Sequence, residues 1–210
     1  MSVGRIITCD ADVAEGAAWL AARDARFVQA LEACGPLPLR RQADGFAALL
    51  DAIVGQQVSV ASARAIWARL EGAGLTDQAA MAGAKDEVLQ AVGLSRQKAR
   101  YGRGLAQAGI DYNGLRGASD ADVIATLVAV PGIGAWTAEI YAMFALGRAD
   151  VFAHGDLALQ EAARGLLGLD KRPNEREMRV IAAEWAPWRA VAARVLWAYY
   201  RVLKARDGVA

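Results

Sequence analysis

The segment Val128-Ala-Val-Pro-Gly-Ile-Gly-Ala-Trp-Thr-Ala138 decides the fold, because it joins two helix-like stretches by a Pro-Gly-x-Gly turn. The first stretch, 119–130, has no glycine or proline, and the second, 135–146, is rich in alanine and aromatic residues. Glycine has no Cβ and tolerates positive φ, so such a turn lets backbone N–H groups approach a phosphate. The N-terminus of the second helix adds unpaired donors and a favourable dipole. We therefore expect Gly132 and Gly134 to donate hydrogen bonds to nucleic-acid phosphates.

Two other interpretations compete for this segment. A dinucleotide-binding fingerprint needs a preceding strand and a third glycine. Here a helical stretch precedes the turn and Thr137 stands at the third position, so we reject that interpretation. A plain corner between two helices, in which glycine only ends one helix and starts the next, stays open when the turn is considered alone.

The composition favours helix along the whole chain. Of the 210 residues, 55% are hydrophobic, alanine dominates, and β-branched residues rarely cluster. Helix start and stop signals predict an all-α fold with many turns. The expected helices span 10–23, 24–33, 44–57, 59–71, 76–81, 85–92, 95–108, 119–130, 135–146 and about 187–206. Asp44 and Ser59 are expected N-caps, and capping boxes are expected at Ser119 and Asn174.

Charge is close to balanced overall but unevenly distributed. The net charge is +1, so the whole molecule is not a strongly basic nucleic-acid binder. Residues 164–206 carry ten Lys and Arg against four Asp and Glu, whereas residues 1–35 carry three against five. Such asymmetry is typical of a nucleic-acid-binding face and equally of an ordinary solvated surface.

The cysteines and the hydropathy pattern exclude several classes. Cys9 and Cys34 have no metal-ligand spacing, and two cysteines cannot hold an iron–sulfur cluster. Free thiols and the absence of a signal-peptide pattern at the start predict a cytoplasmic protein. The most apolar run, 123–146, is broken by Pro131 and two glycines and carries Glu139, so we expect no membrane span.

Five segments, in the same order along the chain, resemble a known family. The hairpin segment is followed by Val151-Phe-Ala-His-Gly-Asp156-Leu-Ala-Leu-Gln160, which resembles the Gly/Pro-rich stretch and aspartate of the helix–hairpin–helix DNA glycosylase superfamily. The other segments are Ile53-Val-Gly-Gln-Gln-Val-Ser59, Gly93-Leu-Ser-Arg-Gln-Lys-Ala99, and Ala186-Pro-Trp-Arg-Ala190 with Trp197. Together they resemble the 3-methyladenine DNA glycosylase II branch over roughly residues 40–205.

The resemblance implies a fold and an activity. It implies two helical lobes with a cleft between them, residues 45–150 carrying the hairpin and residues 1–44 with 151–210 carrying Asp156. The implied enzyme is a monomer that flips alkylated purines out of double-stranded DNA and hydrolyses their N-glycosidic bond, which starts base excision repair. Two alternatives stay open: a non-catalytic helix–hairpin–helix DNA-binding module, and a glycosylase for another lesion such as a deaminated base.

Departures from the family pattern refine this expectation. Relatives that also cut the DNA backbone carry a lysine nucleophile just after the hairpin, where this chain has Trp136. Tryptophan cannot attack a sugar, so the resemblance implies a monofunctional enzyme. Too few residues precede Gly45 for the N-terminal β-rich domain of the larger bacterial enzyme, so a compact helical version is expected.

Asp156 supports two compatible interpretations. It precedes a good helical sequence, where an aspartate commonly caps the helix N-terminus. In the catalytic interpretation, its carboxylate stabilises positive charge that develops on the sugar as the N-glycosidic bond breaks. His154, the single histidine, lies two residues earlier, where it would tune the site, touch DNA or have no direct role.

The remaining site residues follow from the resemblance and from elementary chemistry. Flipped, cationic alkylated bases favour an aromatic pocket, for which Trp136, Trp197 and Tyr141 are candidates with core packing as the competing role. Gln57 fills the gap left by the base or is simply a polar residue at a helix end, and Gln56 beside it is also expected to contact DNA. Thr137, Lys98 and Arg100 are expected at phosphates. No cofactor is required, although the carbonyls of Val128, Val130 and Ile133 are expected to hold Na⁺ or K⁺.

Overall fold

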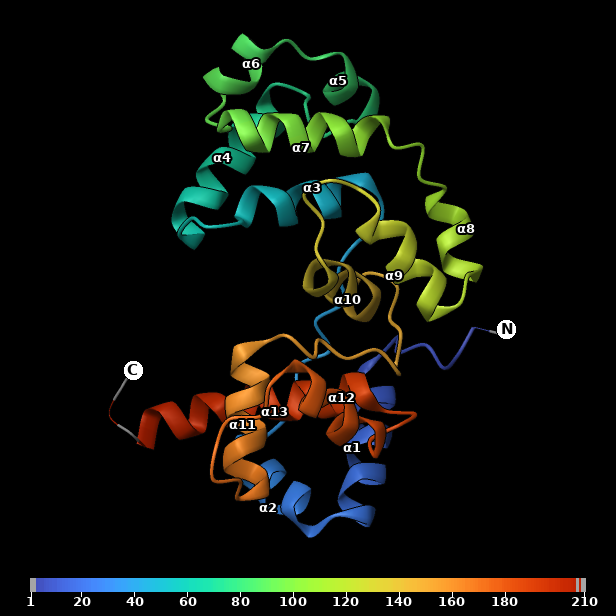
Figure 1. Cartoon of the computed structure of the whole chain (residues 1–210), viewed down its shortest axis with the longest axis vertical. Helices are drawn as coiled ribbons and strands as arrows, with labels where there is room; N and C mark the ends of the chain where they lie inside the picture. The colour runs from blue at the N-terminus through green and yellow to red at the C-terminus, as the bar shows by residue number, and fades with distance from the viewer. Residues whose placement is uncertain (1–2, 207, 209–210) are drawn as a thin grey trace. The chain divides into compact units, whose positions relative to one another are not determined.

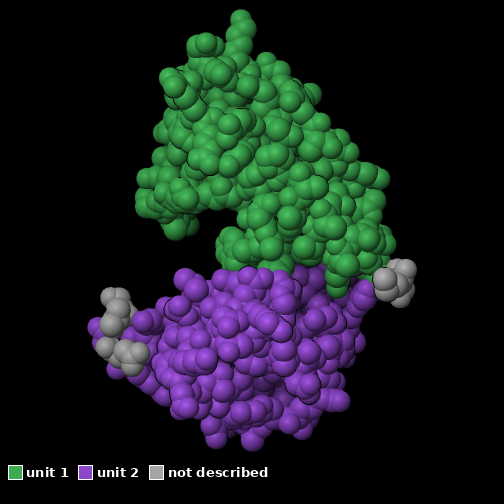
Figure 2. Space-filling view, in the orientation of Figure 1, with its two compact units in different colours: residues 1–3, 42–141 green, residues 4–41, 142–210 purple. Residues whose placement is uncertain are grey.

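The computed structural model describes residues 3–206 and 208, and in that part of the chain every regular element is a helix (Figure 1). The all-α prediction is confirmed. The chain divides into two compact units (Figure 2): unit 1 contains Val3 and Gln42–Tyr141, and unit 2 contains Gly4–Arg41 and the described residues from Ala142 onward. The hairpin belongs to unit 1 and Asp156 to unit 2. The divisions fall at 41/42 and 141/142, whereas the sequence placed them at 44/45 and 150/151.

Unit 1 is built around α7, which packs on α3 with one side and on α5 and α6 with the other (Figure 1). Its helices are α3 (Phe46–Gly55), α4 (Val60–Gly72), α5 (Gln78–Gly83), α6 (Asp86–Ala91), α7 (Arg96–Gln107), α8 (Tyr112–Gly117), α9 (Asp120–Val128) and most of α10 (Ala135–Phe144). Leu49, Leu50 and Ile53 of α3 are completely buried, as is Leu105 of α7. The sequence of α3 therefore supplies the apolar surface on which α7 rests.

Side-chain caps fix the starts of several helices in unit 1. The Ser59 hydroxyl accepts from the Ser62 N–H at 3.2 Å, and Ser95 accepts from Lys98 N–H at the same distance. Asp44, expected to cap α3, does not do so. The residue at the N-cap is Gly45, which provides no side-chain cap, and the Asp44 carboxylate instead accepts from the Arg116 guanidinium, with Nε–Oδ2 at 2.6 Å. An ion pair with a residue 72 positions away has overridden the local capping preference.

Unit 2 is organised around its longest helix, α13, which packs against α1, α2 and α11. Its helices are α1 (Asp10–Arg23), α2 (Ala25–Cys34), α11 (Leu157–Leu167), α12 (Glu175–Ala183) and α13 (Arg189–Arg206). The ring of Trp185 contacts Phe27 at 5.7 Å and Phe152 at 5.5 Å, centroid to centroid. These buried aromatic contacts connect α2, the loop before α11 and the loop after α12 within one core.

Two backbone hydrogen bonds tie the start of unit 2 to the segment after α10. Ile7 N–H donates to the Gly147 carbonyl at 2.7 Å, and Ala149 N–H donates to the Arg5 carbonyl at 3.0 Å. They form an isolated antiparallel bridge, which is too short to be a strand. Among the described residues, no helix combines the length and the apolar character needed to cross a bilayer.

Gly16 of α1 tests the closeness of the α1–α13 packing. A Cβ at Gly16 would lie 2.6 Å from Val191 Cγ2 and 2.7 Å from Trp188 Cε3, whereas a Cβ at the helical Gly104 meets nothing within 4 Å. Both Gly→Ala changes gain the same helix propensity. We expect Gly16→Ala to leave the protein about 1–3 kcal/mol less stable than Gly104→Ala, because the core is overpacked. Urea unfolding of the two variants measures this difference, and equal stabilities would contradict the packing described.

Candidate functional site

A tight turn joins α9 to α10. Ile133 N–H donates to the Val130 carbonyl at 3.0 Å, which places Pro131 and Gly132 at the two central positions. Gly132 has φ of +95°, so the turn has the proline and positive-φ glycine of a type II turn. Gly134 directly precedes α10, and its carbonyl accepts from Ala138 N–H at 3.1 Å. The predicted helix, turn and helix are therefore present.

Two residues from elsewhere in unit 1 hold this turn in place. A Cβ on Gly132 would lie only 2.5 Å from Cγ of Tyr101, so the ring of this α7 residue lies directly against the glycine. The Gln56 amide, just after α3, donates to the Gly132 carbonyl at 3.0 Å. The turn is thus supported by α7 on one side and by the end of α3 on the other.

The hairpin presents donors that the protein itself does not use. Within the described residues, neither the Gly132 N–H nor the Gly134 N–H has a hydrogen-bond partner, and Gly134 is exposed. Next to them, at the start of α10, Trp136 is 48% exposed, although it is a large hydrophobic residue. Thr137 is only 6% exposed, so it offers far less surface to a phosphate than its neighbours do. The backbone N–H groups are therefore better candidates for binding an anion than the Thr137 hydroxyl.

The loop between α3 and α4 lies beside the hairpin and is conformationally unusual. Gln57 is exposed and has φ of +56°, a value uncommon for a residue other than glycine. The Lys98 ammonium donates to the Val54 carbonyl at 2.7 Å, and burial lowers the pKa of Lys98. In the free protein, Lys98 therefore supports the end of α3.

A polar cavity of about 270 Å³ opens between this loop and the start of α7. It is lined by Gln56, Gln57, Val58, Ile66, Gly93, Ser95, Gln97, Lys98 and Tyr101. Two of the segments singled out in the sequence, 53–59 and 93–99, therefore meet at one place. Arg100, one position beyond, is exposed, with its guanidinium carbon 5.6 Å from the centroid of the Tyr101 ring.

Tyr141, a candidate for the base pocket, is a core residue of unit 1. It is 4% exposed, and its hydroxyl accepts from the Gly45 N–H at 2.8 Å. Burial raises the pKa of Tyr141. The hydroxyl therefore anchors the start of α3.

The hairpin carbonyls offer a candidate cation site. Among the described residues, the Val128 and Ile133 carbonyl oxygens accept no hydrogen bond, and the Val130 oxygen accepts one, from the turn. A carbonyl oxygen has two lone pairs, so all three retain capacity for an oxygen-seeking cation. In the same described residues, no group of three or more His, Cys, Asp or Glu side chains is arranged to hold a metal ion.

In unit 2, Asp156 is the N-cap of α11. Its Oδ1 accepts from Ala158 N–H at 2.9 Å and from Leu159 N–H at 3.0 Å, which confirms the capping interpretation. The preceding loop is fixed as well, because the buried Gln160 donates from its amide to the His154 carbonyl at 2.9 Å. His154 is 7% exposed and its ring lies 5.2 Å from that of Phe152. The carboxylate thus lies half-buried on a rigid element.

Trp197 occupies the middle of α13. It is half-buried, and its ring centroid lies 5.8 Å from that of Phe144 at the end of α10. Trp185 and Trp188, in contrast, are buried in the core. Trp197 therefore retains a partly exposed aromatic face, as does Trp136 in unit 1.

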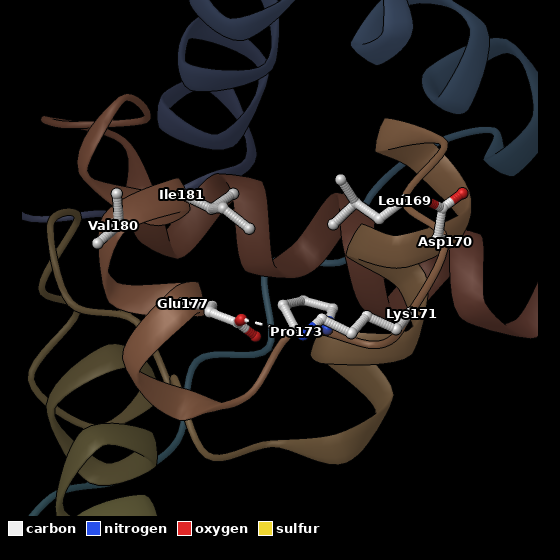
Figure 3. Close-up of a pocket in the computed structure, with 7 residues that line it drawn as sticks. All are labelled: Leu169, Asp170, Lys171, Pro173, Glu177, Val180 and Ile181. Carbon is white, nitrogen blue, oxygen red and sulfur yellow. Dashed lines mark ion pairs between the residues drawn. The ribbon is translucent and has the colours of Figure 1, made fainter.

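A further cavity, of about 590 Å³, lies in unit 2 and contains none of the predicted site residues (Figure 3). It is lined by Leu169, Asp170, Lys171, Pro173, Glu177, Val180 and Ile181. Its walls are largely apolar, and one ion pair spans it, from Lys171 Nζ to Glu177 Oε1 at 3.8 Å.

Sequence reasoning missed the residues that hold the hairpin. Tyr101 was not singled out, and Gln56 and Lys98 were expected to face DNA, yet both donate to backbone carbonyls within unit 1. The one local sign of an ordered Tyr101 was its spacing from Gln97, one helical turn earlier. The Gln97 amide donates to the Tyr101 hydroxyl at 2.8 Å. The hydrogen bonds to the Gly132 and Val54 carbonyls join residues 76 and 44 positions apart, so no local sequence pattern indicates them.

Comparison with known proteins places this geometry in a family. Residues 50–187 match the model of the HhH-GPD superfamily base excision DNA repair proteins, and the chain belongs to that superfamily. The match includes the α3–α4 loop, the hairpin and Asp156. The expected family resemblance is confirmed.

Individual relatives agree in sequence and in structure. DNA-3-methyladenine glycosylase 2 of Escherichia coli is 31% identical over 169 residues, which are 73% of this chain and 57% of that protein. A crystal structure of a DNA-3-methyladenine glycosidase from Bacillus halodurans superposes with a TM-score of 0.80 at 33% identity, covering 93% of this chain and 92% of the other. The Schizosaccharomyces pombe 3-methyladenine DNA glycosylase in complex with abasic DNA gives 0.74 at 25% identity, covering 87% and 95%.

Some matches to curated relatives cover only part of the other protein. The match to a Bacillus subtilis relative, YfjP, covers 50% of this chain and 38% of that protein, at 32% identity. The match to a Mycobacterium tuberculosis transcriptional activator and DNA repair protein covers 16% of the latter. The chain therefore spans less than two thirds of the length of these two curated relatives.

Gly132 tests the support of the hairpin. An alanine there would have both an unfavourable positive φ and a Cβ against the base of the Tyr101 side chain. We expect Gly132→Ala to destabilise the protein by about 1–3 kcal/mol. In the matched variant Gly134→Ser, a Cβ meets nothing within 4 Å and serine is a good N-cap, so stability should change by less than about 0.5 kcal/mol. Urea unfolding distinguishes the two, and a harmless Gly132→Ala would contradict the turn geometry.

Proposed function

We propose that this protein is a monofunctional DNA glycosylase that releases alkylated purines, of the 3-methyladenine and 7-methylguanine type, from double-stranded DNA. The observation that carries the proposal is a rigidly capped aspartate, Asp156, at the family's aspartate position in a chain that also has the hairpin. Membership of a base excision repair superfamily supports it. The protein would act as a cytoplasmic monomer and start base excision repair.

In the proposed chemistry, one carboxylate, that of Asp156, stabilises the transition state. Cleavage of an N-glycosidic bond builds positive charge on the sugar, and a fixed anion near C1′ stabilises that charge. The α11 cap restricts the Asp156 side chain, so the carboxylate is oriented before the substrate arrives. The helix N-terminus also favours a negative charge at this position. A purine alkylated at N3 or N7 is already cationic and leaves as a neutral base, so a modest catalyst suffices.

The target base must leave the stack before it can react. In the proposal, Gln57 enters the gap and offers its amide to the orphaned partner base. Its positive φ supports this assignment, because strained backbone persists mainly where function requires it. Trp136 and Trp197 would contribute aromatic faces for the cationic base, an attraction of about 0.5–2 kcal/mol, and Tyr141 would support the pocket from the core.

Trp136 also decides the proposed reaction type. The family members that cut the DNA backbone use a lysine at this position to form a Schiff base. Tryptophan has no such nucleophile, so the reaction should stop at the abasic site. Phosphate contacts would come from Gly132 and Gly134 N–H groups and from Arg100, with Gln56, Lys98 and Thr137 supporting the surface.

We further propose that a monovalent cation binds the carbonyl oxygens of Val128, Val130 and Ile133 and links the hairpin to a phosphate. Replacing K⁺ by tetramethylammonium at constant ionic strength should then weaken binding to an undamaged duplex, because the larger ion cannot fit among three carbonyls. Fluorescence anisotropy measures the affinity. The same affinity in both salts would count against the cation.

Asp156→Asn separates capping from catalysis. Asparagine caps a helix about as well as aspartate, so the melting temperature should stay within a few degrees. The loss of negative charge should reduce base release by about 10²–10³-fold. The assay incubates the protein with methylated duplex DNA and identifies freed bases by chromatography.

The matched control is Asp170→Asn, which removes an exposed carboxylate from the same unit and should leave base release unchanged. Near-normal release by Asp156→Asn would overturn the catalytic assignment. If the unmodified protein binds DNA but frees no base of any kind, the non-catalytic DNA-binding module is the better description.

A further inference from the structure

Unit 2 contains a group of arginines, Arg40, Arg41, Arg194 and Arg201, that we call the arginine cluster. Arg40 and Arg41 lie between α2 and α3, at the end of the first stretch of unit 2, and the other two lie on α13. Burial, with Arg40 and Arg41 nearby, lowers the pKa of Arg194 to about 10. Burial and the charge of Arg201 lower the pKa of Arg40. These like charges therefore lie close enough to disfavour one another.

The cluster has no acidic partner of its own. Within the described residues, none of its four members forms an ion pair with Asp or Glu. Other arginines of unit 2 do, for example Arg189 with Asp150 at 2.7 Å and Arg179 with Glu175 at 2.6 Å. The positive charge of the cluster is thus left for an anion from outside the chain.

Arg194 forms the rigid base of the cluster. It is 2% exposed, and its two Nη groups donate to the Ala190 carbonyl at 2.8 Å and the Leu39 carbonyl at 3.0 Å. Its guanidinium carbon lies 4.8 Å from the centroid of the Phe144 ring. The buried Nε–H has no hydrogen-bond partner in the described part of the chain. A charged group is costly to bury in this way without a carboxylate.

Arg40 is the residue after Leu39, whose carbonyl accepts a hydrogen bond from Arg194. Its φ is +53°, a conformation that costs a non-glycine residue of order 1–3 kcal/mol. The hydrogen bond to Leu39 fixes the peptide just before this residue, while the Arg40 side chain is exposed. Arg201 is also exposed, and it lies about two helical turns along α13 from the buried Arg194. The cluster therefore combines a buried positive charge with accessible guanidinium groups.

We propose that the arginine cluster binds backbone phosphates of DNA and so gives unit 2 its own contact with the substrate, separate from the hairpin of unit 1. A guanidinium group presents paired N–H donors that match a phosphate in a bidentate arrangement. The proposal rests on the proposed function only in naming DNA as the source of the phosphates. Arg194 is the positioning residue, and Arg40 and Arg201 make the contacts.

The test measures how DNA binding depends on salt. Arg40→Gln and Arg201→Gln each remove one exposed charge, and Arg23→Gln removes an exposed one from α1 of the same unit as the matched control. Binding to an undamaged duplex is followed by anisotropy at several KCl concentrations. We expect each cluster variant to bind several-fold more weakly and its salt slope to fall by about 1. Arg23→Gln should keep the slope of the unmodified protein.

Thermal unfolding distinguishes a loss of DNA contacts from a loss of stability. Removing one of several like charges should leave the melting temperature of Arg40→Gln unchanged or raise it, while DNA affinity falls. If Arg40→Gln is unstable, Arg201→Gln carries the test alone. Unchanged salt slopes in the stable cluster variants would overturn the proposal.

Inorganic phosphate distinguishes the two sources of the anion. If phosphate raises the melting temperature of the unmodified protein but not of the variants, while their DNA salt slopes stay normal, the cluster takes free phosphate and the DNA assignment is wrong. The outcome is independent of base release, because the duplex is undamaged. A protein that frees no base would still show the cluster effect, and an active glycosylase could still lack it.

Discussion

The absence of a side chain at Gly132 is the constraint on which the hairpin of unit 1 and its supports depend. The ring of Tyr101 occupies the place of a Cβ, and the Gln56 amide reaches the Gly132 carbonyl at 3.0 Å. These two contacts join α7, the end of α3 and the hairpin into one body. Because the turn is also held from outside, the N–H groups of Gly132 and Gly134 need not stabilise it and stay available to a ligand. The loop that carries Gln57 is fixed by the same arrangement, since Gln56 is its neighbour.

Local features of the fold were predictable from the sequence because their physics is local. Ser59, Asn174 and Asp156 begin helices by accepting hydrogen bonds from N–H groups two or three residues later. The hairpin was predictable for the same reason, since Pro131 and Gly132 suit a type II turn within four residues. Asp44 shows the limit: its carboxylate had a local role available and took a distant partner, Arg116, instead.

The candidate site was predictable as a set of motifs but not as a set of contacts. Lys98 carries a charge, which suggests phosphate binding, yet its ammonium lies against the Val54 carbonyl 44 residues away. No periodicity or spacing encodes such a pairing. The arginine cluster was hidden for the same reason, because Arg40 and Arg194 are separated by most of the chain. A net charge of +1 hides it further, since paired charges elsewhere cancel in the sum.

Asp156 caps α11 and, in the proposed function, is also the catalytic carboxylate. In the proposed mechanism the carboxylate must keep its orientation as charge develops on the substrate, and the α11 cap contributes to that orientation. The cap also sets the carboxylate at the positive end of a helix dipole, where its own charge is favoured. The arginine cluster follows the same logic with opposite sign. In both places the fold holds a charge by backbone groups, Ala158 and Leu159 N–H for the anion and the Ala190 and Leu39 carbonyls for the cation. A backbone dipole carries no net charge, so it holds a charged side chain in position without adding a counter-charge of its own.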